Sequence, residues 1–310
     1  VYLLAVSASI CSLVAIPQLL GGNPFGLYPG ELTYFDANVR YTGEFLGTIG
    51  NTNLLAAFYC LCIPLFIWHA LTHRALRDRL VLAAAALCLG VLIASRVASG
   101  AVALAAAAVV LIPYYVNYTS HSRKKALIAA GCMAALCVLA LAAVYFYGGG
   151  SGTLHELSQL LHGHVEDSYG SSRVAIWREC LRLAGERPLV GGGPDTLALR
   201  TDMTFSRFVE ETGSTISTHV DNAHCEPLGY LVNLGALGLI PYLALCAESL
   251  RRFFRGCAPA VGAALACYLV QSLFGLGLCL VAPLVWIYMG LICSRKEEET
   301  CKNARSPSTR

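Results

Sequence analysis

One histidine and a set of arginines stand out where a long polar stretch meets an apolar run. His224 closes the polar stretch 148–224, which carries six arginines and no lysine, and the apolar run 228–250 follows it directly. Guanidinium groups bind anions, and an imidazole exchanges protons near neutral pH. Because nearly charge-free apolar segments flank this stretch, these residues indicate chemistry on an anionic group at a membrane surface.

Two arginines are the strongest candidates for holding such an anion. Arg96 ends the apolar segment 80–95 in a turn with little other polar mass, which indicates a function, although snorkelling to lipid phosphates is the alternative. Arg173 lies just inside a predicted helix start, where the helix dipole disfavours a cation and a bound anion would resolve the conflict. The other loop arginines alternate with acidic residues, which favours a solvated, salt-bridged face.

A lipid-linked diphosphate fits guanidinium groups at an outer membrane surface. Arginine binds phosphate oxygens bidentately and stabilises the charge that develops on a diphosphate leaving group. His224 would then accept a proton from an attacking hydroxyl or hydrogen-bond the substrate, while interfacial packing is the alternative without chemistry. Glu226 is close to His224 in sequence and could orient it or act in its place. Asp221 and Asn222 precede His224 and are candidate caps of the next helix.

The composition is that of an integral membrane protein. Of the 310 residues, 56% are hydrophobic and 13% are charged, with a mean hydropathy of +0.60, whereas a soluble domain carries about 25% charged residues. The first residue is Val, so we expect a processed or N-terminally incomplete chain with further helices upstream. Segment 1–20 lacks a basic n-region and a clear cleavage site, which predicts a span rather than a signal peptide.

The apolar runs predict an all-α integral membrane protein with about eight transmembrane helices and one large extracytoplasmic helical loop. A span takes about 20 residues, and lipid leaves no backbone amide unpaired. Two of the runs are short, and 260–292 has a re-entrant hairpin as its alternative. The predicted spans are 1–20, 53–71, 80–95, 101–118, 126–147, 227–250, 258–274 and 278–293.

The predicted organisation has four parts. Residues 1–147 form about five helices with an outer segment at 21–47, residues 148–224 form the outer loop, residues 225–293 form about three helices, and 294–310 form a charged, disordered tail. With eight spans, four basic clusters and all four lysines fall on one side, which the positive-inside rule makes cytoplasmic. The C-terminus is therefore expected in the cytoplasm.

Three helices are predicted within the outer loop. The first covers 153–164, where Leu recurs at helical spacing. The second follows Ser171 and Ser172, its predicted caps, and stops at Pro188. A third is predicted from about 194 to 208. Together they predict a small helical cap that lies on the bilayer surface.

The remaining sequence signals argue against several classes of site. Most of the 14 cysteines lie in apolar spans and behave as small hydrophobes, and a bridge between the outer Cys180 and Cys225 is an open but unsupported alternative. No zinc pattern, D-x-D, P-loop or dinucleotide motif occurs, so chemistry without a metal or cofactor is favoured. Nothing in the sequence predicts nucleic-acid binding.

Four stretches in order resemble the O-antigen ligase and polymerase superfamily of membrane glycosyltransferases. Residues 221–238 are similar to its His-Asn-x-x-Leu…Gly-x-x-Gly signature, and 47–56 to its Gly-Thr-Phe-Gly-Asn-Pro-Asn segment. The Ser-Arg pair at 95–96 resembles its Ser-Arg-Gly motif, and 172–193 its outer-loop motif. The likeness extends over about residues 40–290.

Two positions depart from the family pattern. Cys225 stands where the family has Asn after the histidine, and a thiol cannot supply the hydrogen bonds of a carboxamide. Thr52 stands where the family has Pro, between Asn51 and Asn53, and capping of the following span is an alternative role for both asparagines.

The resemblance implies a GT-C-like glycosyltransferase in the bacterial cytoplasmic membrane. Such enzymes move a glycan from an undecaprenyl-diphosphate carrier to a hydroxyl of a glycan, lipid or protein acceptor on the extracytoplasmic face, with inversion and without metal. His224 would activate or position the acceptor, and Arg173 and Arg96 would hold the diphosphate. The implied site residues are His224, Arg173, Arg96, Arg40, Asn222 and Glu226.

Two other function classes remain as alternatives. A transporter or flippase of an anionic or lipid-linked solute would have charged residues near the membrane midplane and broken helices, and the predicted spans show neither. A structural membrane subunit would use the loop to bind a partner, and its loop arginines would matter no more than its loop glutamates.

Overall fold

The computed structural model describes residues 1–28, 32–34, 36, 45–73, 75–209 and 213–294. These residues form eleven helices and one antiparallel pair of strands. The elements are α1 (Tyr2–Leu19), α3 (Thr52–Thr72), α4 (Leu76–Ala94), α5 (Ala98–Ser120), α6 (Arg123–Tyr145), α7 (Thr153–Leu161), α8 (Tyr169–Glu186), α9 (Leu197–Arg200), β1 (Thr204–Val209), β2 (Ser214–His219), α10 (Glu226–Phe254), α11 (Pro259–Gln271) and α12 (Ala282–Ser294).

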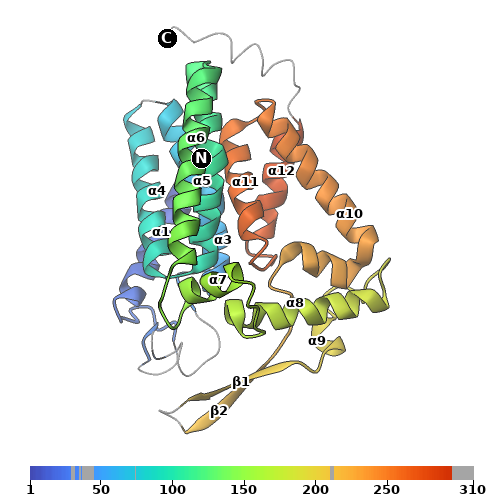
Figure 1. The fold of residues 1–310 in the computed structure, drawn as a ribbon. Helices are drawn as coiled ribbons and strands as arrows, with labels where there is room; N and C mark the ends of the chain where they lie inside the picture. The colour runs from blue at the N-terminus through green and yellow to red at the C-terminus, as the bar shows by residue number, and fades with distance from the viewer. Residues whose placement is uncertain (29–31, 35, 37–44, 74, 210–212, 295–310) are drawn as a thin grey trace.

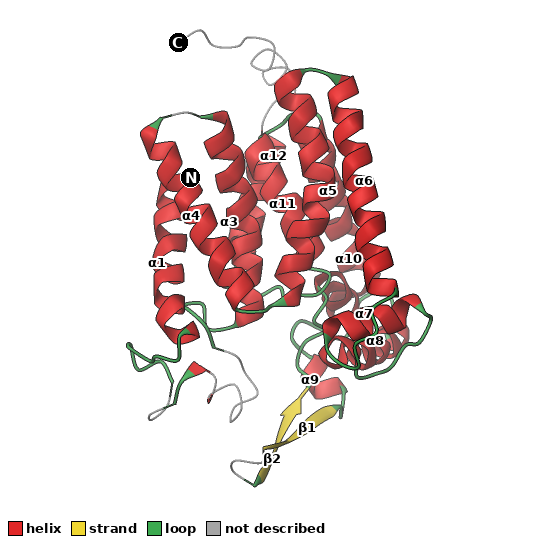
Figure 2. Cartoon of the chain, turned by 60° about the vertical axis from the view of Figure 1, so that its left-hand side comes forward, coloured by secondary structure: helices red, strands yellow, loops and turns green. Residues whose placement is uncertain are grey.

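The long helices run alternately in opposite directions and place their connections at two ends of the bundle. The α4–α5 and α11–α12 connections share one end with α7, α8, α9 and the hairpin, and the α3–α4, α5–α6 and α10–α11 connections share the other (Figures 1 and 2). Five helices are long and apolar enough to cross a membrane, namely α1, α3, α5, α6 and α10. The protein is therefore a multi-pass membrane protein, and a total of eight spans stays a prediction.

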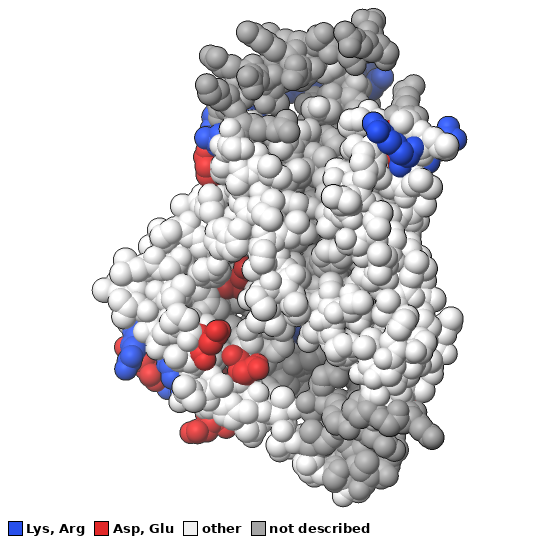
Figure 3. All heavy atoms as spheres, turned by 180° about the vertical axis from the view of Figure 1, so that it is seen from behind, with Lys and Arg blue, Asp and Glu red and all other residues white. Residues whose placement is uncertain are grey.

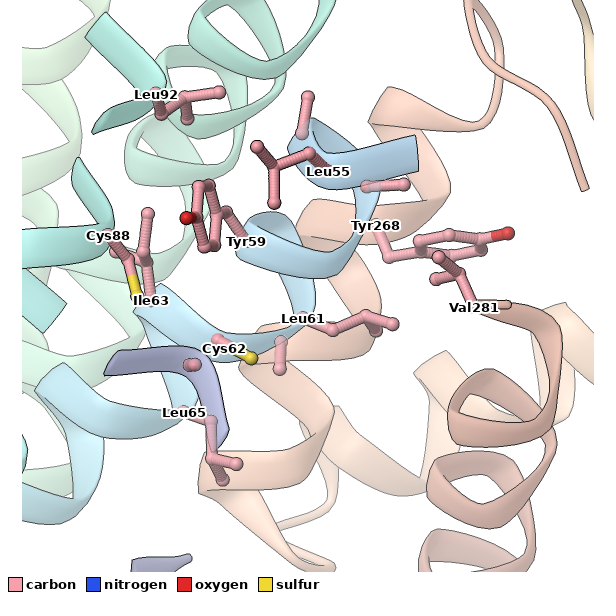
Figure 4. Packing of buried hydrophobic residues seen from close by; sticks show 14 of the residues in the cluster. Leu55, Tyr59, Leu61, Cys62, Ile63, Leu65, Cys88, Leu92, Tyr268 and Val281 are labelled. Atoms are coloured by element: carbon pink, nitrogen blue, oxygen red, sulfur yellow. The ribbon is translucent and has the colours of Figure 1, made fainter. Parts of the chain in front are cut away.

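Helix α3 is the centre of the bundle. It packs between α4 and α11, and its Phe66 is fully buried. Tyr59 of α3 and Tyr268 of α11 are fully buried as well (Figure 4). Asn51 caps α3, since its side chain accepts hydrogen bonds from the backbone N–H groups of Asn53 and Leu54, so the predicted capping role is confirmed. In contrast, α6 buries none of its side chains.

Charged side chains are separated along the bundle. Figure 3 shows Lys and Arg at the end with the α3–α4 and α10–α11 connections and again toward α8, with a broad and largely uncharged surface between them. Such a band is what the hydrocarbon core of a bilayer requires of a protein surface.

The span predicted at 227–250 is present as α10, but the helix is broken, so the expectation of spans without a break is wrong for this one. Gly235 has φ 65° and ψ −165°, which is not helical. The break frees backbone groups on both sides, and the segment after α8 binds them. The N–H groups of Gly192 and Gly193 donate to the carbonyl oxygens of Val232 and Asn233, at 3.0 and 2.8 Å. A helix break needs such partners, because unpaired backbone groups are costly in or near lipid.

The same segment also accepts hydrogen bonds from the far side of the break. The carbonyl of Pro188 accepts from Ala236 N–H at 2.8 Å, and that of Leu189 accepts from Leu237 N–H at 3.1 Å. Together, residues 188–193 and 232–237 form what we call the glycine interlock. The contact is possible only without side chains, since a Cβ on Gly235 would lie 2.3 Å from the backbone of Leu189.

The outer loop differs from its prediction in two places. The helix predicted at 194–208 is wrong: α9 is one turn long, and the chain continues as β1, which pairs with β2 and projects away from the helices (Figure 2). Ser171 and Ser172 do not cap α8, since they adopt left-handed backbone conformations in a kink near its start. The helices predicted at 153–164 and before Pro188 are present as α7 and α8.

The glycine interlock predicts that Gly235→Ala destabilises the protein by about 3 kcal/mol or more. The added Cβ clashes with the backbone of Leu189, and this φ/ψ region is open almost only to glycine. Gly229→Ala is the matched control, because a Cβ there meets nothing within 4 Å. Thermal unfolding of the detergent-purified proteins measures both, and a Gly235→Ala variant as stable as Gly229→Ala would contradict the prediction.

Candidate active site

His224 has an uncommon backbone conformation. Its φ is 48°, in the left-handed region that few residues other than glycine adopt. The backbone N–H of His224 donates to the side-chain oxygen of Asn222 at 3.1 Å, which closes a local turn. Asn222 and Asp221 therefore do not cap α10, whose N-cap is Cys225 without a side-chain hydrogen bond. The turn sets the direction in which the imidazole leaves the chain.

Helix α8 packs against this turn. Trp177 donates its indole N–H to the carbonyl oxygen of Ala223, at 3.0 Å. Ala223 is buried and belongs to the same small core as Ile176 and Cys180 of α8. Arg173 precedes Trp177 by four residues and therefore lies on the same face of the helix.

Arg173 and His224, both predicted site residues, lie close enough to interact. The positive charge of Arg173 acts on the imidazole, and burial and this charge, in that order, lower the pKa of His224 below its ordinary 6.5, while Asp221 opposes them. Burial also lowers the pKa of the Arg173 guanidinium. At neutral pH the site therefore pairs a neutral imidazole with a guanidinium that remains charged.

Each of these side chains has a buried nitrogen that finds no acceptor or donor among the described residues. They are the Nε of Arg173 and the Nδ1 of His224. Another nitrogen of Arg173, Nη1, donates to the carbonyl of Gly170 at 2.6 Å. Buried polar atoms are nearly always hydrogen-bonded, so two free ones on neighbouring cationic and imidazole groups are suited to an anionic substrate.

The backbone before Arg173 is strained. Gly170, Ser171 and Ser172 all have positive φ, between 59° and 64°, and each serine in this conformation is unfavourable. The kink is anchored at Gly170, whose N–H donates to the carboxylate of Glu156 in α7 at 3.0 Å. Regular helix then starts at Arg173, so the guanidinium does lie at a helix start, as predicted.

Glu226 has partners other than His224. Its carboxylate accepts the hydroxyl hydrogen bond of Tyr268 at 2.8 Å, and its backbone N–H donates to the carbonyl of Ser272 at 2.8 Å. In the part of the chain that the structure describes, no hydrogen bond joins Glu226 to His224. The residue ties the start of α10 to the end of α11.

The other two predicted arginines, Arg96 and Arg40, are not joined to the Arg173–His224 pair in the part of the chain that the structure describes. Arg96 lies exposed in the α4–α5 turn with φ 57°, at the same end of the bundle as α8 (Figure 1). Within residues 75–209 and 213–294, no ion pair or side-chain hydrogen bond connects it to Arg173 or His224. Arg40 lies outside the described residues.

The remaining arginines of α8 and α9 have structural partners. Arg178 pairs with Asp167 at 2.6 Å, and Arg182 pairs with Glu179 and Glu186, so the predicted salt-bridged face is confirmed for these two. Arg200 instead donates to the backbone carbonyls of Val232 and Leu183, and thereby fastens α8 to α10 next to the glycine interlock.

Neither a metal site nor a disulfide is found at this end of the molecule among the described residues. No group of three or more His, Cys, Asp or Glu side chains there is arranged to bind a metal ion. Cys180 and Cys225 are both free. The Trp177–Ala223 hydrogen bond was missed in the sequence, although Trp four residues after Arg173 was a visible signal for a shared helix face.

Comparison with protein families agrees with this geometry. A family model described as O-antigen ligase matches residues 83–243, just over half of the 310 residues. The chain belongs to the O-antigen ligase family. The matched region contains Arg96, Arg173 and His224, together with the whole glycine interlock. No curated protein matches the chain.

The site predicts that inorganic pyrophosphate stabilises the protein through Arg173. A ligand that binds only the folded state raises its melting temperature, here by about 2–4 °C at saturating concentration. Arg173→Ala should remove the shift, whereas Arg178→Ala, on the exposed face of the same helix, should keep it. Thermal unfolding with and without pyrophosphate measures the shift, and an equal shift in Arg173→Ala would contradict an anion site at this residue.

Proposed function

We propose that this protein transfers a glycan from an undecaprenyl-diphosphate carrier to an acceptor hydroxyl on the extracytoplasmic face of the membrane. Membership of the O-antigen ligase family supports glycosyl transfer. The observation that carries the proposal is the pairing of Arg173 and His224, each with a buried nitrogen lacking a partner among the described residues. A cation beside a neutral base is the arrangement that a diphosphate leaving group and an attacking hydroxyl require.

The reaction proceeds in one displacement. The acceptor oxygen attacks the anomeric carbon while His224 takes the hydroxyl proton, so a carbon–oxygen bond forms to the acceptor. The bond from the anomeric carbon to the diphosphate oxygen breaks, and undecaprenyl diphosphate leaves with the bonding electrons. Arg173 stabilises the negative charge that develops on that oxygen. A single displacement inverts the anomeric configuration, and no step needs a metal or a protein nucleophile.

The arrangement of charges supports the proposed orientation. The basic connections α3–α4, α5–α6 and α10–α11 share one end of the bundle, which the positive-inside rule assigns to the cytoplasm. The Arg173–His224 pair lies at the other end and faces the extracytoplasmic side. Arg96 lies at that same end, and we assign it, with Arg40, to the lipid-linked donor.

A transporter or flippase is the second candidate function, because the break at Gly235 in α10 is a feature of many transporters. The glycine interlock occupies the backbone groups freed by this break, so they do not remain to bind a substrate. Proteoliposomes with labelled lipid-linked donor distinguish the two. A transferase joins the label to a membrane-impermeant acceptor outside, whereas a flippase moves the donor between leaflets and forms no glycoside.

The proposed function predicts that His224→Ala and Arg173→Ala each lower transfer by about 100-fold or more. Both remove a group that acts on the reacting atoms. Arg182→Ala, which loses only surface ion pairs to Glu179 and Glu186, should stay within about twofold of wild type. Product formation in proteoliposomes at matched protein levels measures transfer, and cells with either inactive variant should accumulate the lipid-linked donor. Wild-type rates in both variants would refute the proposal.

The pH dependence should follow His224. Its neutral form is the active one, so transfer is full above the folded-state pKa and is lost as pH falls through it. Because that pKa lies below 6.5, the acidic limb of kcat/KM should also lie below pH 6.5. Asp221 raises this pKa, so Asp221→Asn should move the limb to lower pH. Asp167→Asn is the control, and an acidic limb above 6.5 would exclude His224 as the base.

A further inference from the structure

Trp177 makes a long-range side-chain hydrogen bond to the turn of His224. Its indole N–H donates to the carbonyl of Ala223, the residue directly before His224, across 46 positions of sequence. Its ring also lies against that of Phe274, from the segment after α11, with centroids 6.2 Å apart. The indole is therefore held by the start of the α11–α12 connection as well as by α8.

The turn needs such support because its conformation is unfavourable. A non-glycine residue with φ near 48° costs of order 1 kcal/mol and persists only where its surroundings fix it. Two hydrogen bonds hold the turn: the N–H of His224 donates to the side-chain oxygen of Asn222, and the indole N–H of Trp177 donates to the carbonyl of Ala223. Ala223 itself is 2% exposed, so loss of the hydrogen bond to its buried carbonyl would be costly.

One face of α8 carries both the guanidinium and the indole. Arg173 and Trp177 are one helical turn apart, so the spacing between the charge at Arg173 and the carbonyl before His224 is set by a rigid element. The charge of Arg173 reaches the imidazole in this arrangement. If the indole hydrogen bond is lost, the turn can move relative to α8 while α8 stays folded.

We propose that Trp177 is a positioning residue: its indole N–H holds the left-handed turn of His224 at the distance from Arg173 that transfer requires. This inference rests on the proposed function. Trp177 acts through the backbone of Ala223 and through His224, and the proposal requires no contact between Trp177 and the substrate.

Trp177→Phe tests the indole N–H, because it removes the donor and keeps an aromatic ring. We expect kcat to fall by about 10–100-fold, since a shift of about 1 Å at a catalytic group has effects of this size. KM for the lipid-linked donor should change by less than about threefold. Trp286→Phe is the matched control, because Trp286 lies exposed in α12, and it should transfer at the wild-type rate.

The pH profile separates positioning from a general loss of structure. Burial and Arg173 from α8 lower the pKa of His224, and Asp221 in its own segment raises it. A turn released from α8 loses the first two influences, so the acidic limb of Trp177→Phe should move toward pH 6.5. A variant that is merely less stable would lose active protein with its limb unchanged.

The outcomes distinguish this inference from the proposed function. A Trp177→Phe variant with wild-type kcat and an unchanged acidic limb of the pH profile overturns the positioning role, provided that His224→Ala and Arg173→Ala are inactive in the same assay. A raised donor KM with unchanged kcat also overturns it and makes the ring part of a sugar site. If Trp177→Phe does not yield folded protein, Asn222→Ala tests the second hydrogen bond of the turn by the same two readouts. Wild-type transfer by His224→Ala would instead refute the proposed function.

Discussion

The glycine interlock between residues 188–193 and 232–237 is the constraint on which the rest of the site depends. Four backbone hydrogen bonds replace those that α10 loses at Gly235. Gly191 and Gly235 let the two backbones approach closely, because neither has a side chain. Arg200 adds two further hydrogen bonds, to Val232 and Leu183. These contacts fix the end of α8 to the broken helix, so the outer loop becomes part of the membrane domain rather than a tethered cap.

A fixed α8 is what brings the two chemical groups together. Arg173 lies at its start and Trp177 one turn later, and the turn that carries His224 is held against this face. Backbone strain is part of this arrangement, because Ser171 and Ser172, just before Arg173, and His224 itself have left-handed backbones. Local strain of this kind persists only where the surrounding structure is rigid, which the glycine interlock and the small core around Ile176 provide.

Much of this was predictable from the sequence, for identifiable reasons. Apolar runs marked the long helices because lipid allows few alternatives, and their residue types made Arg173 and His224 the predicted site residues. The break in α10 was missed because its partners lie about 40 residues earlier and do not appear in local hydropathy. The hairpin after α9 was missed because a helix was extended through it, although Thr, Phe and Val in β1 and Thr and Ile in β2 favour strands. The roles assigned to Glu226 and Asn222 depended on side-chain direction, which sequence spacing alone does not give.

The glycine interlock also bears on the order in which the protein matures. Its first segment, at 188–193, leaves the ribosome before the second, at 232–237, and the hydrogen bonds between them cannot form until α10 has been made. The outer loop therefore remains undocked until the next helix has been made. Arg173 and His224 come together only at that late stage, so a truncated or incompletely inserted chain has the apolar helices without the assembled Arg173–His224 pair.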